Sequence, residues 1–195
     1  MANVLLFHHA LGRTDGVLRF ADDLRAAGHE VSVPDLYGGA VFDDLDIGVA
    51  HADDLGMMTL VEAGAAIADQ QDVPTVFAGF SLGGLVAHKL AQTAPAAVGA
   101  LLYHYGDVPI ETFGDVWPES VPVQLHIAED DPFGEEETLK AFVDVADQSA
   151  GAELIVYPGS AHLFTDATST EYDEQSASLV LERTLEFLTH VDNGA

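Results

Sequence analysis

A serine flanked by glycines follows a short apolar run in the segment VFAGFSLGGLVAHK, residues 76–89. If Ser81 presents its hydroxyl at the tip of a strand, the chain must turn sharply there and strain the serine backbone. Side chains two residues before and after the serine would then collide, which leaves room only for Gly79 and Gly83. The G-x-S-x-G pattern therefore predicts a nucleophile elbow, provided that a strand precedes it and a helix follows. The alternative is a glycine-rich connection in an ordinary α/β domain.

Two later loops carry the groups that activate a serine. The loops HIAEDDPFGEEE and YPGSAHLFTD each follow a short apolar run. A histidine can take the serine proton, and a carboxylate can fix the histidine tautomer and stabilise its cation. His162 is the predicted base, because it lies at a strand end and the order Ser, Asp, His is that of α/β-hydrolases. Glu129, Asp130 and Asp131 are adjacent and point in different directions, so at most one of them suits this base.

The first apolar run also ends in a polar segment, VLLFHHALGRTDG. In this architecture, a backbone N–H of an early loop joins the N–H that follows the nucleophile, and together they bind the developing oxyanion. Leu82 is predicted to supply the second donor, and Ala10 or a neighbour the first. The adjacent histidines His8 and His9 suggest a metal pair, but consecutive residues of an extended segment face opposite ways. We therefore expect no metal and no cofactor.

Short apolar runs alternate with helical patterns along the whole chain. This alternation predicts a mostly parallel sheet with helices on both faces, whose site lies beyond the carboxyl ends of the strands. We expect one α/β-hydrolase domain over residues 1–195 with no large lid domain, because no repeat or linker divides the chain. The predicted strands are 4–7, 31–33, 75–78, 100–103, 123–127 and 154–157, and the predicted helices are 17–27, 51–69, 82–93, 135–146 and 174–190.

The charge balance excludes some classes of partner. Thirty-three acidic residues face six Lys or Arg, a formal net charge of −27, which repels nucleic acid. No basic region precedes the N-terminal VLLF and no run is long enough for a membrane span, so we expect a cytoplasmic protein without a membrane partner. The chain has no cysteine, which excludes disulfides, thiolate metal sites and a cysteine nucleophile.

Six segments resemble the dienelactone hydrolase family in their order and approximate spacing. They are LLFHHALGRTDG, GHEVSVPDLYGG, GFSLGG, AEDDPF, YPGSAHLFTD and LERTLEFL, and they cover nearly the whole chain. The resemblance implies a nucleophile at Ser81 and a base at His162. It implies that the acid is Asp131, because the family's aspartate directly precedes a pair like Pro132-Phe133. It also implies oxyanion donors at Leu82 and Ala10.

Three departures from the family pattern put its usual substrate in doubt. The best-known members use cysteine at the elbow, where this chain has Ser81. They place a glutamate beside the oxyanion loop, and His9 occupies the matching position. They bind a substrate carboxylate with arginines, one of them four residues after the catalytic histidine, where this chain has Asp166. We expect Asp166 to repel a carboxylate.

The expected reaction is hydrolysis of a small neutral ester, lactone or thioester through a Ser81 acyl-enzyme, a carboxylic ester hydrolase reaction. The alternatives are a hydrolase-fold binding or scaffold protein without turnover, and an acyltransferase or perhydrolase with the same triad. A monomer and a homodimer are both compatible with the sequence. The residues predicted to line the pocket, each of which could equally be core packing, are His9, Leu11, Tyr37, Trp117 and Phe133.

The net charge generates a first prediction. A high-salt origin and an ordinary acidic protein both fit it, since self-repulsion of this size is tolerated best under strong screening. A protein adapted to high salt should show a melting temperature that rises from low to molar KCl. Circular dichroism melts over that range measure it, and a melting temperature independent of salt would contradict the high-salt origin.

Overall fold

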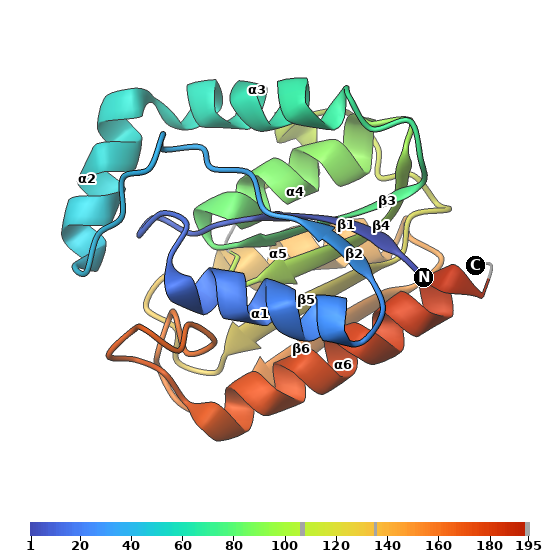
Figure 1. The fold of residues 1–195 in the computed structure, drawn as a ribbon. Coiled ribbons are helices and arrows are strands. Elements are labelled where there is room, and N and C mark those ends of the chain that lie inside the picture. The colour runs from blue at the N-terminus through green and yellow to red at the C-terminus, as the bar shows by residue number, and fades with distance from the viewer. Residues whose placement is uncertain (106–107, 135, 194–195) are drawn as a thin grey trace.

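The computed structural model describes residues 1–105, 108–134 and 136–193. Its centre is a sheet of six strands in the order β2-β1-β3-β4-β5-β6, and every neighbouring pair is parallel (Figure 1). This confirms the predicted α/β class. The strands are β1 (Asn3–Phe7), β2 (Glu30–Ser32), β3 (Thr75–Phe80), β4 (Ala97–Tyr103), β5 (Val123–Ala128) and β6 (Ala152–Tyr157).

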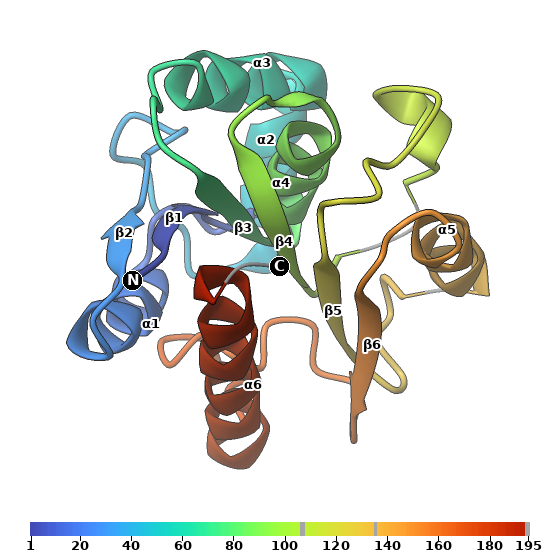
Figure 2. The same cartoon turned by 90° about the vertical axis from the view of Figure 1, so that its right-hand side faces the viewer.

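Helices cover both faces of the sheet (Figure 2). Helices α1 and α6 lie on one face, and α3, α4 and α5 lie on the other. No lid domain is inserted between these elements within the part of the chain that the structure describes. The helices are α1 (Asp15–Ala26), α2 (Leu45–Leu55), α3 (Met57–Ala68), α4 (Leu82–Thr93), α5 (Glu136–Ala146) and α6 (Glu174–Asp192), with a 3₁₀ helix, η1 (Ile110–Thr112).

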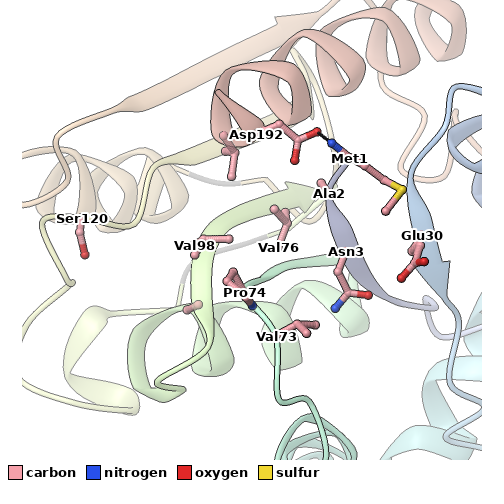
Figure 3. A pocket seen from close by; sticks show the side chains of 12 residues that line it. Met1, Ala2, Asn3, Glu30, Val73, Pro74, Val76, Val98, Ser120 and Asp192 are labelled. Atoms are coloured by element: carbon pink, nitrogen blue, oxygen red, sulfur yellow. Dashed lines mark ion pairs between the residues drawn. The ribbon is translucent and has the colours of Figure 1, made fainter. Parts of the chain in front are cut away.

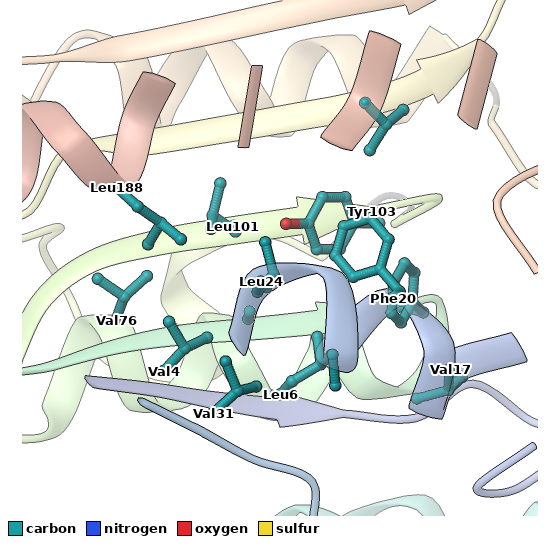
Figure 4. Packing of buried hydrophobic residues seen from close by; sticks show 14 of the residues in the cluster. Val4, Leu6, Val17, Phe20, Leu24, Val31, Val76, Leu101, Tyr103 and Leu188 are labelled. Carbon is teal, nitrogen blue, oxygen red and sulfur yellow. The ribbon is translucent and has the colours of Figure 1, made fainter. Parts of the chain in front are cut away.

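The central strands are apolar on both faces because each face has its own core. Val4 and Leu6 of β1 pack toward α1 and α6 with Leu188, in the cluster of Figure 4. Leu5 and Phe7, which alternate with them, pack toward α3 and α4. This explains why the strands read as continuous apolar runs without a polar face.

The predicted helix over 51–69 is wrong, because the segment forms two helices. Gly56 separates α2 from α3 and has a φ of 88°, a backbone conformation that residues other than glycine rarely adopt. Helix α2 begins earlier than expected, at Leu45, where the Asp44 side chain accepts a hydrogen bond from the Ile47 N–H. The expected start of the helix over 135–146 lies outside the described residues.

The parallel register brings the loops of the sequence motifs to one edge. The elbow follows β3, the His8–His9 segment follows β1, and the acid and histidine loops follow β5 and β6. In parallel strands all of these ends lie at the same edge of the sheet. Among the described residues, no helix is both long and apolar enough to cross a membrane.

A depression of about 520 Å³ lies at the opposite edge, beside Met1 and the last turn of α6 (Figure 3). The N-terminal ammonium group there pairs with Asp192 of α6, and Asn3, Val73 and Val98 contribute to the lining. These residues lie at or near the amino ends of β1, β3 and β4, so none of the motif loops reaches this depression.

Candidate active site

The elbow has the predicted context and geometry. Ser81 lies between β3 and α4, with a φ of 50° and a ψ of −113° that side chains seldom adopt. A Cβ added at Gly79 would collide with the carbonyl group of Gly83, and one added at Gly83 would collide with the Phe7 carbonyl of β1. Both glycines are therefore required by close backbone approach.

Ser81, His162 and Asp131 form a chain of hydrogen bonds across three loops. His162 Nε2 lies 2.8 Å from Ser81 Oγ, and His162 Nδ1 lies 2.8 and 2.9 Å from the two Asp131 oxygens. Because a carboxylate only accepts, Nδ1 carries the ring proton and Nε2 presents its lone pair to the serine hydroxyl. This is the tautomer that a general base requires.

Asp131 differs from its acidic neighbours in burial. Its side chain is buried and also accepts a hydrogen bond of 2.9 Å from the Phe133 N–H. Glu129 and Asp130 are exposed to solvent. The structure thus places one of the three adjacent acids against His162, in the register that the Pro132-Phe133 pair implies.

Two backbone N–H groups of residues beside the serine have no acceptor among the described residues. Leu82 is the first residue of α4, and the first N–H groups of a helix have no intrahelical partner. The Ala10 N–H makes no hydrogen bond within the described part of the chain, and Ala10, Ser81 and Leu82 line one pocket. These groups could stabilise negative charge on an oxygen next to Ser81 Oγ.

The two histidines after β1 are held on opposite sides of the loop. The Leu36 N–H donates to His8 Nε2, so His8 Nδ1 carries the proton and donates to the His9 carbonyl. Burial lowers the pKa of His8 to about 4. His9 turns the other way, toward Asp166, with Nε2 and Oδ2 2.7 Å apart. Within the described residues, no group of three or more His, Asp or Glu is arranged to hold a metal ion.

The expected role of Asp166 as a group that repels substrate is wrong. Its side chain is only 2% exposed and does not line the pocket that contains Ser81. Burial raises the pKa of Asp166, but hydrogen bonds from His9, Thr14 and Thr168 outweigh this and hold the pKa well below its ordinary value. A buried, fully bonded carboxylate cannot meet a substrate carboxylate.

The pocket beside Ser81 has a volume of about 270 Å³ and is mostly apolar. Phe133 lines it as predicted, with its ring centroid 4.5 Å from that of His162. No Lys, Arg, Asp or Glu is among the described residues that line it. Its lining residues are Ala10, Leu45, Val49, Ala52, Met57, Ser81, Leu82, Leu85, His104, Tyr105, Val108, Phe133 and His162.

The other four residues predicted to line this pocket lie elsewhere. His9 is buried against Asp166, and Leu11 lines a neighbouring cleft with Arg13 and Thr14. Tyr37 packs edge-on against His8 in the protein interior. Trp117 is part of the core, where its Nε1–H donates to the Val121 carbonyl.

Sequence reasoning missed the pocket residues of α2 and α3, and also His104. Leu45 and Val49 were missed because α2 begins before the predicted helix. His104 directly follows β4, so the rule that sites lie beyond strand ends could have found it. Its φ is 52°, its Nε2 lies 2.8 Å from Thr165 Oγ1, and burial and the nearby His162 lower its pKa well below the usual value.

The sheet, the elbow after β3 and the loops after β5 and β6 define an α/β-hydrolase fold. The family model of the dienelactone hydrolase family matches residues 1–192, so the chain belongs to that family. No curated protein matches the sequence.

Solved structures share this fold at low sequence identity. A candidate dienelactone hydrolase from Klebsiella pneumoniae superposes with a TM-score of 0.77 at 17% identity, covering 97% of this chain and 87% of that one. A dienelactone hydrolase-like promiscuous phosphotriesterase from metagenomic libraries gives 0.77 at 21% identity, covering 98% and 87%. An esterase from Pyrococcus furiosus gives 0.64 at 16% identity, covering 97% and 82%. At these identities the likeness concerns the fold alone.

Proposed function

We propose that this hydrolase-family protein is a serine esterase that cleaves small neutral esters or lactones through an acyl-enzyme on Ser81. The observation that carries the proposal is the hydrogen-bonded chain Ser81–His162–Asp131. Family membership supports a hydrolase, and the free Leu82 and Ala10 N–H groups beside the serine support acyl transfer.

In the proposed first half-reaction, Ser81 Oγ attacks the carbonyl carbon while its proton passes to His162 Nε2. Asp131 stabilises the resulting imidazolium, and the Leu82 and Ala10 N–H groups bind the oxyanion. The tetrahedral intermediate collapses, the bond from carbon to the alkoxy oxygen breaks, and His162 returns the proton to that oxygen. In a lactone this step opens the ring.

In the second half-reaction, water attacks the acyl group on Ser81 and gives its proton to His162 Nε2. Collapse of the second tetrahedral intermediate releases the carboxylic acid and returns the proton to Ser81 Oγ. The reaction therefore requires only water as co-reactant. No cofactor has a step in this scheme.

The pocket favours a neutral acyl group. A carboxylate on the substrate would lose its hydration against Leu45, Val49 and Met57 without a cation to pair with. The net charge of −27 also disfavours the approach of anions. Both effects point away from the carboxylate-bearing substrates of the best-known family members.

The nucleophile assignment predicts that a fluorophosphonate probe labels Ser81. Labelling is located by mass spectrometry of the digested protein, and turnover is measured on a panel of short-chain aryl esters, lactones and thioesters. The Ser81→Ala variant should lose both, because among the described residues Ser81 supplies the hydroxyl that His162 Nε2 can activate. Retained turnover in this variant would overturn the proposal.

The acid assignment predicts unequal effects of two neighbouring substitutions. Asp131→Asn should lower kcat by roughly three to four orders of magnitude, because the amide favours the wrong tautomer of His162. Asp130→Asn is the matched control, with the same chemical change on an exposed side chain. Steady-state kinetics on an aryl ester compare them, and a larger loss in the control would move the acid to position 130.

The neutral pocket predicts a preference between matched substrates. A neutral lactone should exceed its carboxylate-bearing analogue in kcat/KM by at least about tenfold, since the pocket offers the anion no partner. Leu45→Arg should narrow this gap by adding a cation to the lining. Ile47→Arg adds the same charge on the same helix at a residue that is 56% exposed and outside the pocket, and should change the ratio less.

The ratio of kcat/KM for the neutral lactone to that for its carboxylate-bearing analogue should also shrink at high salt if part of it reflects long-range repulsion. Equal wild-type rates on a dienelactone carboxylate and a neutral ester would mean that another group of the protein binds the anion.

A further inference from the structure

A buried carboxylate outside the pocket connects two loops of the candidate site. Asp166 lies four residues after His162, on the loop that follows β6. Its Oδ2 accepts from His9 Nε2 at 2.7 Å and from Thr14 Oγ1 at 2.6 Å. Its Oδ1 accepts from the N–H and hydroxyl of Thr168 at 2.7 and 2.6 Å. Each oxygen thus has two donors, which is a well-satisfied arrangement for a buried carboxylate.

His9 has one tautomer that fits this arrangement. The Leu11 N–H, which can only donate, lies 3.2 Å from His9 Nδ1, so Nδ1 accepts. The ring proton is therefore on Nε2 and points at Asp166. Through these two contacts the ring connects Asp166 to the backbone on both sides of Ala10, which lines the pocket with Ser81 and is the proposed oxyanion donor.

The first turn of α1 fixes the carboxylate from a third side. Thr14 is the N-cap of α1, and its hydroxyl oxygen accepts from the Val17 N–H while the hydroxyl donates to Asp166. A Cβ added at Gly16 would collide with the Asp166 carboxylate. Thr14 and Gly16, which the catalytic assignment leaves unexplained, therefore both lie directly against Asp166.

We propose that Asp166 and His9 are positioning residues, whose pair ties the loop of His162 to the loop of the Ala10 N–H. This inference rests on the proposed function. Neither side chain lines the Ser81 pocket, so the pair would act through backbone geometry and not by touching substrate.

The contact between Asp166 and His9 matters for the reaction because it would keep the Ala10 N–H in place. An oxyanion donor is effective only within about 2.7–3.1 Å of the developing charge, and a displacement of about 1 Å can cost about 10²-fold in rate. The Leu82 N–H is fixed by α4, but the Ala10 N–H belongs to a loop with no helix or strand of its own. His8 holds one side of this loop, through Leu36, and His9 holds the other.

The central test is Asp166→Asn in the full chain. The amide NH₂ must replace one carboxylate oxygen, and it would face either the His9 Nε2–H or the Thr168 N–H. A change of the His9 tautomer would set a second N–H against that of Leu11. We expect kcat on an aryl ester to fall by about 10- to 100-fold with KM changed less than about threefold, because ground-state binding does not use the oxyanion donors.

Two comparisons separate positioning from general destabilisation. Asp15→Asn removes the same charge from an exposed side chain in the first turn of α1 and should leave kcat unchanged. His9→Gln keeps an N–H donor directed at Asp166 and should retain more activity than His9→Leu. Circular dichroism and endpoint titration of Ser81 with the fluorophosphonate give the folded, labelled fraction to which every kcat is normalised.

An amide hydrogen-exchange measurement tests the bridge without turnover. In Asp166→Asn, the Leu11 amide should exchange faster than in the wild type, while the Gly84 amide, which donates to the Ser81 carbonyl, should keep its rate. An unchanged kcat and unchanged Leu11 exchange in a folded Asp166→Asn variant would overturn the inference. If the wild type hydrolysed none of the esters, the proposed function would fail, and the exchange data alone would decide whether the bridge exists.

Discussion

The close crossing of β1, β3 and the start of α4 is the constraint on which the candidate site depends. Gly83 lies against the Phe7 carbonyl, and Gly79 lies against Gly83, so a side chain at either glycine would force the strands and helix apart. Ser81 keeps its unusual φ because the Tyr103 carbonyl of β4 accepts its N–H at 2.7 Å. The same packing brings the Leu82 N–H and the loop after β1 to one place.

Neutral histidines connect the elements around this crossing. Only six Lys or Arg occur in the chain, and buried imidazoles make several of the contacts between loops. His8 joins the β1 loop to Leu36, and His104 joins the end of β4 to Thr165. An imidazole suits this task, since it offers one donor and one acceptor and stays uncharged where burial lowers its pKa, as it does for both. His9 contacts Asp166, and His162 contacts Asp131, through hydrogen bonds between loops.

Two of the departures from the family pattern, His9 and Asp166, form one contact outside the Ser81 pocket. The family resemblance associates the position of His9 with a glutamate and that of Asp166 with a substrate-binding arginine. In this protein the two side chains contact each other. Both side chains are buried outside the pocket beside Ser81, and none of the described residues that line this pocket is Lys, Arg, Asp or Glu. This arrangement supports the proposed preference for neutral acyl groups.

The sequence alone predicted the fold class, the strand ends that carry the candidate site, and two of its central residues, Ser81 and His162. The elbow glycines around Ser81, the alternation of apolar runs and helical patterns, and the position of His162 after a strand are local signals, and local sterics or periodicity decide them. Among the three adjacent acids, only the family resemblance singled out Asp131. Tertiary structure alone decided the pocket and the partner of Asp166. Leu45 and Met57 reach the pocket because Gly56 divides α2 from α3, and His9 meets Asp166 across 157 residues of chain. Such contacts depend on how the ends of different strands converge, which no spacing within one segment encodes.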